Sequence, residues 1–103
     1  MVKEDCIFCK IAKGEIKSEK ILETDNFFAI KDINPKTKGH SLVISKKHYA
    51  TLLDVPSSLL GEFLEAAKEL ALKLLKEENA EGFNLVVNSY RVAGQLVPHV
   101  HLH

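Results

Sequence analysis

Three histidines at the end of the sequence alternate with apolar residues, in the order His99, Val100, His101, Leu102, His103. Neighbouring side chains of a β-strand point to opposite faces, so a strand would place the three imidazoles on one face and both apolar side chains in a core. Rings on one face lie about 7 Å apart along the strand, close enough to act on one small ligand. The alternatives are a polar edge strand or a tag remnant, although a tag is usually a run of consecutive histidines. The alternation therefore favours a strand that presents reactive imidazoles.

A cysteine pair near the other end of the sequence offers a second kind of chemistry. Cys6 and Cys9 form a C-x2-C pair, the spacing at which two thiolates bind one zinc ion. A redox dithiol would be expected within a βαβ unit, which the surrounding sequence does not predict. Two buried thiols are a further alternative. Any other zinc ligands are not at zinc-finger spacing, so the pair alone does not identify them.

The end of the sequence resembles the histidine triad (HIT) family of nucleotide hydrolases and transferases. The family pattern is His-apolar-His-apolar-His followed by two apolar residues, commonly preceded by Gly-Gln and an apolar pair. Gly94, Gln95, Val97 and residues 99–103 match this pattern. The two trailing apolar residues are absent because the sequence stops at His103, so we expect the end of this strand to fray and weaken the site.

The resemblance implies hydrolysis or transfer at the α-phosphate of nucleoside phosphate derivatives, such as adenosine phosphoramidates or dinucleoside polyphosphates. A neutral imidazole, with an ordinary pKa of about 6.5, attacks a negatively charged phosphoryl group without charge repulsion. It would form a covalent nucleotidyl-histidine intermediate. The family nucleophile corresponds to His101. His103 and His40 would hydrogen-bond phosphoryl oxygens or the leaving group, and His99 would support the strand.

The resemblance also implies the residues that bind the nucleotide. Asp32 matches an acid that binds the ribose hydroxyls, although by itself it reads equally well as a turn aspartate. Asn88 and Gln95 match positions that donate hydrogen bonds near the phosphate, whereas Leu96 replaces the Ser or Thr of many members. The apolar slot for a purine base would be formed by residues for which core packing is the alternative role. These are Ile7, Phe8, Ile11, Ile30, Ile33 and Leu42.

A structural zinc ion is a further implication of the resemblance. Some bacterial-type HIT proteins bind zinc through such a cysteine pair, a histidine after the third strand and the first histidine of the triad. The matching residues are Cys6, Cys9, His48 and His99. Four protein ligands leave no open position for a substrate, so the site would be structural. The alternative for His48 is an ordinary surface histidine.

The elements that must position these residues can be predicted along the chain. Apolar spacing predicts a short helix over residues 6–13, capped by Asp5 and ended by Gly14, and a long helix from about residue 57 to 78. We predict five strands, over residues 20–23, 27–32, 40–45, 83–88 and 97–103. This order predicts an α+β fold with a five-stranded antiparallel sheet and both helices on one side of it. It agrees with the HIT fold and with one domain over residues 1–103.

Composition limits the classes of function and partner. The 103 residues are 46% hydrophobic, enough for one small domain with its own core. Lys plus Arg and Asp plus Glu both total 14, so no excess of basic residues suggests nucleic-acid binding. No apolar run is long enough for a membrane span, and the N-terminus does not resemble a signal peptide, so we expect a cytoplasmic protein. The wide apolar face of the long helix, together with the family habit, predicts a homodimer.

Two other functions are compatible with parts of the sequence. One is a nucleotide-binding regulatory or scaffold module, but binding alone would not need the four histidines at positions 40, 99, 101 and 103. The other is a catalytic metal site formed by the triad itself. An ordinary ATPase is disfavoured because no Walker-type glycine-rich loop is present.

Overall fold

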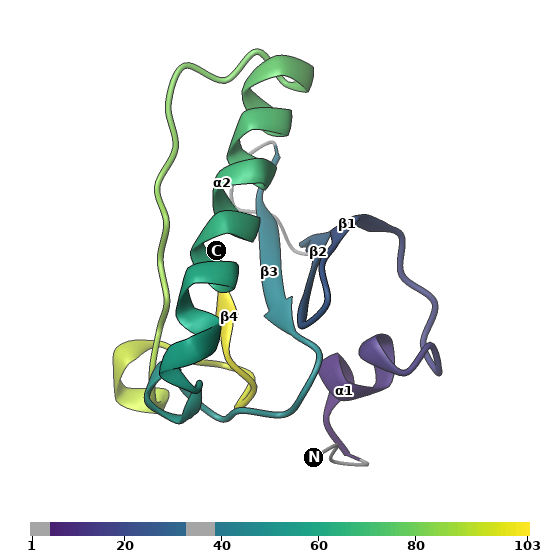
Figure 1. The fold of residues 1–103 in the computed structure, drawn as a ribbon, viewed down its shortest axis with the longest axis vertical. Coiled ribbons are helices and arrows are strands. Elements are labelled where there is room, and N and C mark those ends of the chain that lie inside the picture. Colours follow the sequence, from purple (N-terminus) through teal and green to yellow (C-terminus); the bar gives the residue numbers. More distant parts are fainter. Residues whose placement is uncertain (1–4, 33–38) are drawn as a thin grey trace.

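A four-stranded antiparallel sheet with one helix on each face forms the centre of the computed structural model, which describes residues 5–32 and 39–103 (Figure 1). The strands lie in the order β1-β2-β3-β4. Their bounds are Lys20–Glu23 for β1, Phe27–Lys31 for β2, Ser41–Ser45 for β3 and His101–Leu102 for β4. The helices are α1, Ile7–Ala12, and α2, Leu60–Glu77. Short 3-10 turns occupy Leu52–Asp54, Ser57–Leu59 and Arg91–Ala93.

The two faces of the sheet are covered by different helices. Phe27 and Val43 belong to a core that includes α2, whereas Phe28 and Ile44 pack with residues of α1. We predicted both helices on one side, and this was wrong. The reason is that consecutive residues of β2 and β3 are apolar, so both faces of the sheet must be buried.

Helix α2 is the long predicted helix, and its small residues bring it close to the sheet. Phe63 stacks on Phe27 with ring centroids 4.7 Å apart and an interplanar angle of 3°. Ala66, Ala67 and Leu70 continue the buried stripe. The helix begins at Leu60 rather than residue 57, because the preceding residues form a 3-10 turn after Pro56. None of the helices in the described part of the chain is long and apolar enough to cross a membrane.

Helix α1 is short and begins with a cysteine that caps it. The Cys6 sulfur accepts a hydrogen bond from the Cys9 amide at 3.5 Å, so Cys6, not Asp5, is the N-cap residue. Gly14 follows the helix with a φ of +82°, a left-handed conformation that glycine adopts without steric cost. Both cysteines are therefore held at the start of α1.

The predicted strand over residues 83–88 is absent, so the sheet has four strands instead of five. The segment is extended, but its backbone pairing is limited to Val86 and His103. The Val86 amide donates to the His103 carbonyl at 3.3 Å, and the His103 amide donates to the Val86 carbonyl at 2.8 Å. These two bonds form one reciprocal pair, and a single pair does not make a strand.

Strand β4 is also shorter than the predicted strand over residues 97–103. Two hydrogen bonds divert the chain before it: the His99 amide donates to the Val97 carbonyl at 2.8 Å, and the Val100 amide donates to the Tyr49 carbonyl at 2.6 Å. Pairing with β3 begins only at His101, which faces Ile44.

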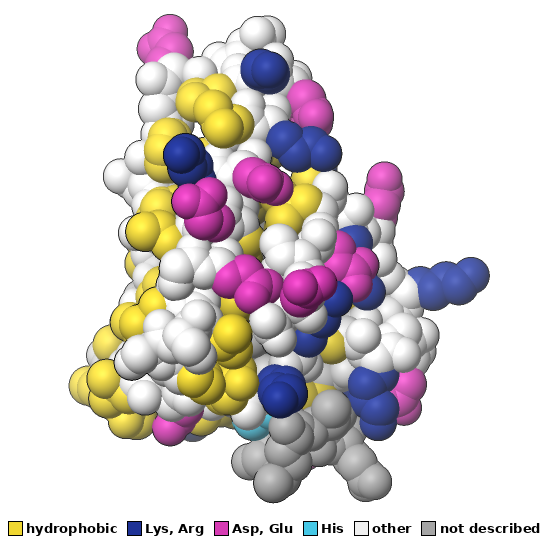
Figure 2. All heavy atoms as spheres, viewed as in Figure 1, with side chains coloured by type: hydrophobic (Ala, Val, Ile, Leu, Met, Phe, Trp, Pro, Cys, Tyr) yellow, Lys and Arg dark blue, Asp and Glu magenta, His cyan; other side chains and the backbone are white. Residues whose placement is uncertain are grey.

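Large apolar side chains remain exposed on α2 and on the segment that follows it. Leu64 is 59% exposed, Val92 97% and Leu96 91%. Figure 2 shows hydrophobic side chains gathered along the left side of the molecule, over the chain between α2 and β4. An exposed apolar surface of this kind is typical of a protein interface.

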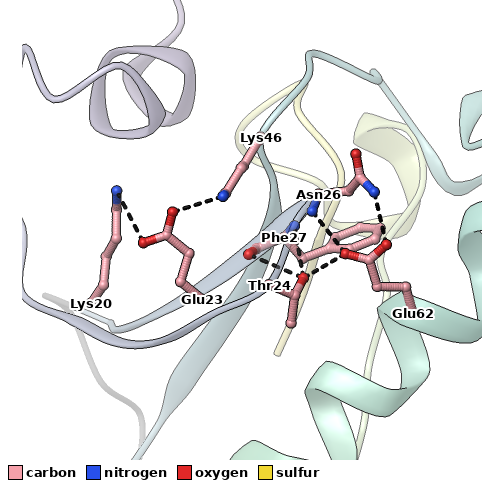
Figure 3. Close-up of polar contacts among 7 residues, drawn as sticks. All are labelled: Lys20, Glu23, Thr24, Asn26, Phe27, Lys46 and Glu62. Carbon is pink, nitrogen blue, oxygen red and sulfur yellow. Dashed lines mark hydrogen bonds and ion pairs between the residues drawn. The ribbon is translucent and has the colours of Figure 1, made fainter.

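A carboxylate of α2 fixes the turn between β1 and β2 (Figure 3). Glu62 accepts hydrogen bonds from the Thr24 hydroxyl at 2.6 Å and from the backbone and side-chain amides of Asn26 at 2.7 and 2.8 Å. Beside it, Glu23 pairs with Lys46 at 2.7 Å. The contacts of Glu62 attach the hairpin to the first turn of α2.

Candidate active site and metal centre

The alternation of histidines and apolar residues has the predicted consequence in three dimensions. Val100 and Leu102 lie in the core beneath α2. On the opposite face, the Phe8 ring of α1 makes edge contacts with His99 and His101, at centroid distances of 5.7 and 5.0 Å. The rings of His101 and His103 are 4.9 Å apart. The three imidazoles therefore lie together, although only His101 belongs to a regular strand.

The hydrogen bonding of His101 determines which of its nitrogens is available for chemistry. Nδ1 of His101 lies 2.8 Å from the backbone carbonyl of His99. A carbonyl can only accept, so Nδ1 donates and carries the proton. In the neutral ring the lone pair is then on Nε2.

A second group of polar side chains lies beside the triad. Nε2 of His40 is 2.9 Å from Nδ1 of His103, and Nδ1 of His40 is 3.4 Å from a carboxylate oxygen of Asp32. His40 directly precedes β3 and Asp32 directly follows β2, so the β2–β3 pairing brings them together. All three side chains are half-buried.

The four residues predicted to bind zinc form one cluster. One ligand atom from each of Cys6, Cys9, His48 and His99 lies within 4.8 Å of the others. Nδ1 of His99 is 3.2 Å from the Cys6 sulfur and 3.5 Å from the Cys9 sulfur. Nδ1 of His48 is 3.3 Å from the Cys9 sulfur. The spacing brings two sulfur and two nitrogen donors toward one point, a donor set that suits zinc.

The hydrogen bonds and burial of His99 suit a neutral imidazole whose Nδ1 faces the two thiols. Its Nε2 donates to the backbone carbonyl of Ser45 at 2.7 Å, which leaves the Nδ1 lone pair facing the thiols. Burial lowers the pKa of His99 to about 4, so the ring is neutral at pH 7. Burial also raises the pKa of the Cys6 thiol, and a bound cation would stabilise its thiolate. Sequence reasoning did not identify Ser45, because it acts through its backbone carbonyl.

The predicted base slot is partly assembled. Phe8, Ile11, Ile30 and Leu42 are buried in one cluster between α1 and the sheet. Ile7 is 43% exposed and lies outside that cluster. Ile33 lies outside the described residues. The cluster is in contact with the triad, since Phe8 belongs to it.

Gln95 and Asn88 occupy different surroundings. Gln95 is buried, and its side-chain nitrogen donates to the carbonyls of Ala50 at 2.6 Å and Val97 at 3.0 Å, while its oxygen accepts from the Tyr90 amide at 2.7 Å. It therefore fixes the loop before the triad. Asn88 lines a groove of about 420 Å³ beneath α2, which His40 and His103 also line.

Comparisons with known proteins identify the family of this chain. The family model described as HIT domain matches residues 13–103. The chain is 43% identical over 102 residues to an adenosine 5′-monophosphoramidase of Candida albicans, covering 95% of this chain and 67% of that protein. It is 38% identical over 102 residues to an adenylylsulfatase of Arabidopsis thaliana, covering 99% and 52%. A zinc-bound histidine triad family protein of Mycobacterium smegmatis has a TM-score of 0.90 at 36% identity, covering 96% of this chain and 72% of that one.

Proposed function

The chain belongs to the HIT family, and from this premise we propose that it hydrolyses or transfers nucleoside phosphate derivatives at the α-phosphate. Relatives named as an adenosine 5′-monophosphoramidase and an adenylylsulfatase support an adenosine nucleotide as the first substrate class to test. The observation on which the proposal depends is the bond from His101 Nδ1 to the His99 carbonyl, because it leaves Nε2 of His101 as a nucleophile.

The proposed reaction has two steps. In the first, Nε2 of His101 forms a bond to the α-phosphorus, and the bond from phosphorus to the leaving group breaks. The leaving group takes the bonding electron pair and needs a proton, for which the nearby His103 is the donor. In the second step water attacks phosphorus and gives one proton to His103, while the bond from phosphorus to nitrogen breaks and its electron pair returns to Nε2 of His101. His40 and His103 would also donate hydrogen bonds to the developing charge on phosphoryl oxygens.

The remaining predicted residues would bind the nucleotide. The buried apolar cluster that contains Phe8 and Leu42 lies next to His101, where a base attached to the reacting phosphate would lie. Asp32 would accept hydrogen bonds from the ribose hydroxyls, and Asn88 would donate to the phosphate. Gln95 would have to release a backbone carbonyl before it could donate to a phosphate, because both of its amide hydrogens have acceptors.

We also propose a structural zinc ion bound by Cys6, Cys9, His48 and His99. The ion would supply a rigid cross-link rather than a Lewis acid, because all four positions are taken by protein ligands. Cys6 caps α1, Cys9 lies within it and His99 precedes β4, so the cross-link would hold the Phe8 side of the site against the triad.

The assembly proposed for this chain is a homodimer. The exposed apolar side chains of α2 and of the segment after it, including Leu64, Phe83 and Val92, offer a surface that a second copy would bury. A two-fold axis would make this surface self-complementary.

The decisive experiment measures turnover on adenosine and guanosine phosphoramidates and dinucleoside polyphosphates. We expect His101→Ala to have no detectable turnover but to bind nucleotide, because the two-step route requires the nucleophile. His40→Ala and His103→Ala should be slower by on the order of 10²–10³, as for loss of one hydrogen-bond donor. Exposed Lys47→Ala, adjacent to His48 but outside the site, is the control.

A trapping experiment identifies the intermediate directly. Wild type mixed with an activated adenylate and quenched in alkali should have an adenylyl group on His101 that is stable to base and labile to acid. Label on another residue, or wild-type turnover by His101→Ala, would show that the assignment is wrong. Nucleotide binding without turnover of any compound would favour a binding module instead. Turnover that disappears with chelation while the protein stays folded would favour a catalytic metal.

A further inference from the structure

Tyr90 has a backbone conformation that is ordinarily adopted by glycine. It lies in the loop that connects the extended segment after α2 to the triad (Figure 1), and its φ is +74° with a ψ of 153°. A Cβ atom is crowded in this region, so another residue stays there only when surrounding contacts hold it. The side chain is a weak anchor, because Tyr90 is 58% exposed. The contacts that hold this residue must therefore involve its backbone.

Both peptide groups of Tyr90 are bonded to Gln95. The Tyr90 amide donates to Oε1 of Gln95 at 2.7 Å, and the Tyr90 carbonyl accepts from the Gln95 amide at 3.1 Å. The Ala93 amide donates to the same carbonyl at 3.1 Å. Gln95 is buried, so its bonds are shielded from water. Gln95 thus supplies two of the three bonds that fix the strained residue.

The other end of the Gln95 side chain connects this loop to the triad. Its Nε2 donates to the carbonyls of Ala50 and Val97 at 2.6 and 3.0 Å. The Val97 carbonyl also accepts from the His99 amide at 2.8 Å. One side chain therefore links Tyr90 to Val97 and, through a shared carbonyl, to the first histidine of the triad.

The position of Asn88 depends on the same loop. Asn88 lies two residues before Tyr90 and lines the groove that His103 also lines. Gly94, on the other arm of the loop, is so near that a Cβ atom there would lie 3.6 Å from Nδ2 of Asn88. The two arms are therefore in contact, and a change in the backbone of Tyr90 would move Asn88.

We infer that Gln95 is a positioning residue, which holds Tyr90 in its strained conformation and thereby fixes Asn88 and the start of the triad. This role differs from the phosphate contact predicted from the sequence. The oxygen and both hydrogens of the Gln95 amide have partners within the protein, which suits a residue that works through the loop. The inference rests on the proposed function only for the reaction that the triad performs.

Two substitutions of Tyr90 measure the strain without any substrate. Tyr90→Ala and Tyr90→Gly both remove the ring, but only alanine keeps the Cβ atom. In ordinary backbone conformations alanine is favoured over glycine by about two- to fivefold in the folding equilibrium constant. Here we expect the opposite order, with Tyr90→Gly favoured by at least about fivefold in urea unfolding at one fixed protein concentration. Equal stabilities, or the ordinary order, would overturn the inference.

The role of Gln95 is tested by its loss in three backgrounds: wild type, Tyr90→Ala and Tyr90→Gly. Gln95→Ala should lower kcat by about 10- to 100-fold in the first two, because misplacement of reacting groups by about 1 Å costs on the order of 10² in rate. In Tyr90→Gly the loss should be at least about fivefold smaller, since a loop without strain needs less holding. If Gln95→Ala does not fold, Gln95→Met fills the same space without the hydrogen bonds and replaces it.

A side chain that contacts the phosphate would give a different result. Its loss would lower kcat by the same factor in all three backgrounds, and that outcome would show that Gln95 does not act through Tyr90.

Nuclear magnetic resonance gives a readout that does not depend on turnover. The side-chain amide of Asn88 and the backbone amide of Val100 have no bond to Gln95 in the structure. Their signals should shift in Gln95→Ala and return toward the wild-type positions when Tyr90→Gly is added. Signals that stay in place, or that shift equally with and without Tyr90→Gly, would contradict the inference. If wild type turned over no substrate, the proposed function would fail, while the unfolding and resonance measurements still decided the role of Gln95.

Discussion

Replacement of Glu62 by alanine tests how strongly α2 fixes the β1–β2 hairpin. The carboxylate accepts three hydrogen bonds, from the Thr24 hydroxyl and from both amides of Asn26 (Figure 3). The bonds from Thr24 and then Asn26 lower the pKa of Glu62, which indicates that they favour its ionised form. In Glu62→Ala the donors of Thr24 and Asn26 lose their acceptor.

The expected loss of stability follows from the exposure of the site. A hydrogen bond to a charged group contributes about 1.5–3 kcal/mol when it is well shielded. Glu62 is only half-buried, so water replaces much of what the three bonds provide. We expect a total loss of about 2 kcal/mol for Glu62→Ala. For a domain of this size that corresponds to a fall in Tm of about 8–16 °C. Glu62→Gln keeps the shape of the side chain and removes its charge, so its free energy of unfolding should fall by about half as much as that of Glu62→Ala.

The assay is urea unfolding at one fixed protein concentration, because association would make apparent stability depend on concentration. The control is Glu65→Ala, an exposed glutamate three residues further along α2. It should change stability by less than about 0.5 kcal/mol. If Glu62→Ala and Glu65→Ala had equal midpoints, the hydrogen bonds to the hairpin would contribute nothing measurable and the reasoning would be refuted.

The other predictions concern pH, metal, core and assembly. The pKa of Glu62 is lowered in the folded protein, so its ionised form contributes to folding stability above the ordinary value of 4.5, and that contribution is lost as pH falls below it. The free energy of unfolding of Glu62→Gln should therefore fall less than that of wild type as the pH is lowered. Purified protein should contain about one zinc per chain by elemental analysis, and Cys9→Ala should lose it and melt at a lower temperature while keeping some turnover; metal-free wild type of unchanged stability would contradict this. Phe63→Ala removes the ring stacked on Phe27 and should lower the free energy of unfolding by about 3–5 kcal/mol, measured in urea. Light scattering at micromolar concentration should give twice the 11.5 kDa chain mass, and a monomer mass would exclude the dimer.

The sequence by itself determined the features that depend on local periodicity. The alternation of histidines with Val100 and Leu102 predicted that the two apolar side chains lie in the core and the imidazoles on the other face. The structure has this arrangement although the regular strand is only two residues long. The apolar stripe of α2 and the first three strands were predictable for the same reason, since side-chain direction follows from position in a strand or helix. The C-x2-C spacing likewise placed two thiols at one end of a short helix.

The tertiary structure decided everything that depends on contacts between distant segments. Helix α1 lies on the face of the sheet opposite α2, because β2 and β3 are apolar on both faces. The strand over residues 83–88 did not form, because strand pairing needs a partner along its length and local propensity does not supply one. The side chain of Gln95 has the hydrogen-bond donors of a phosphate-binding residue. Its amide hydrogens are donated to the backbone carbonyls of Ala50 and Val97, and no sequence pattern predicts these contacts. The placement of His40 between Asp32 and His103 joins the residue after β2, the residue before β3 and the residue after β4, and only the strand order brings those three points together.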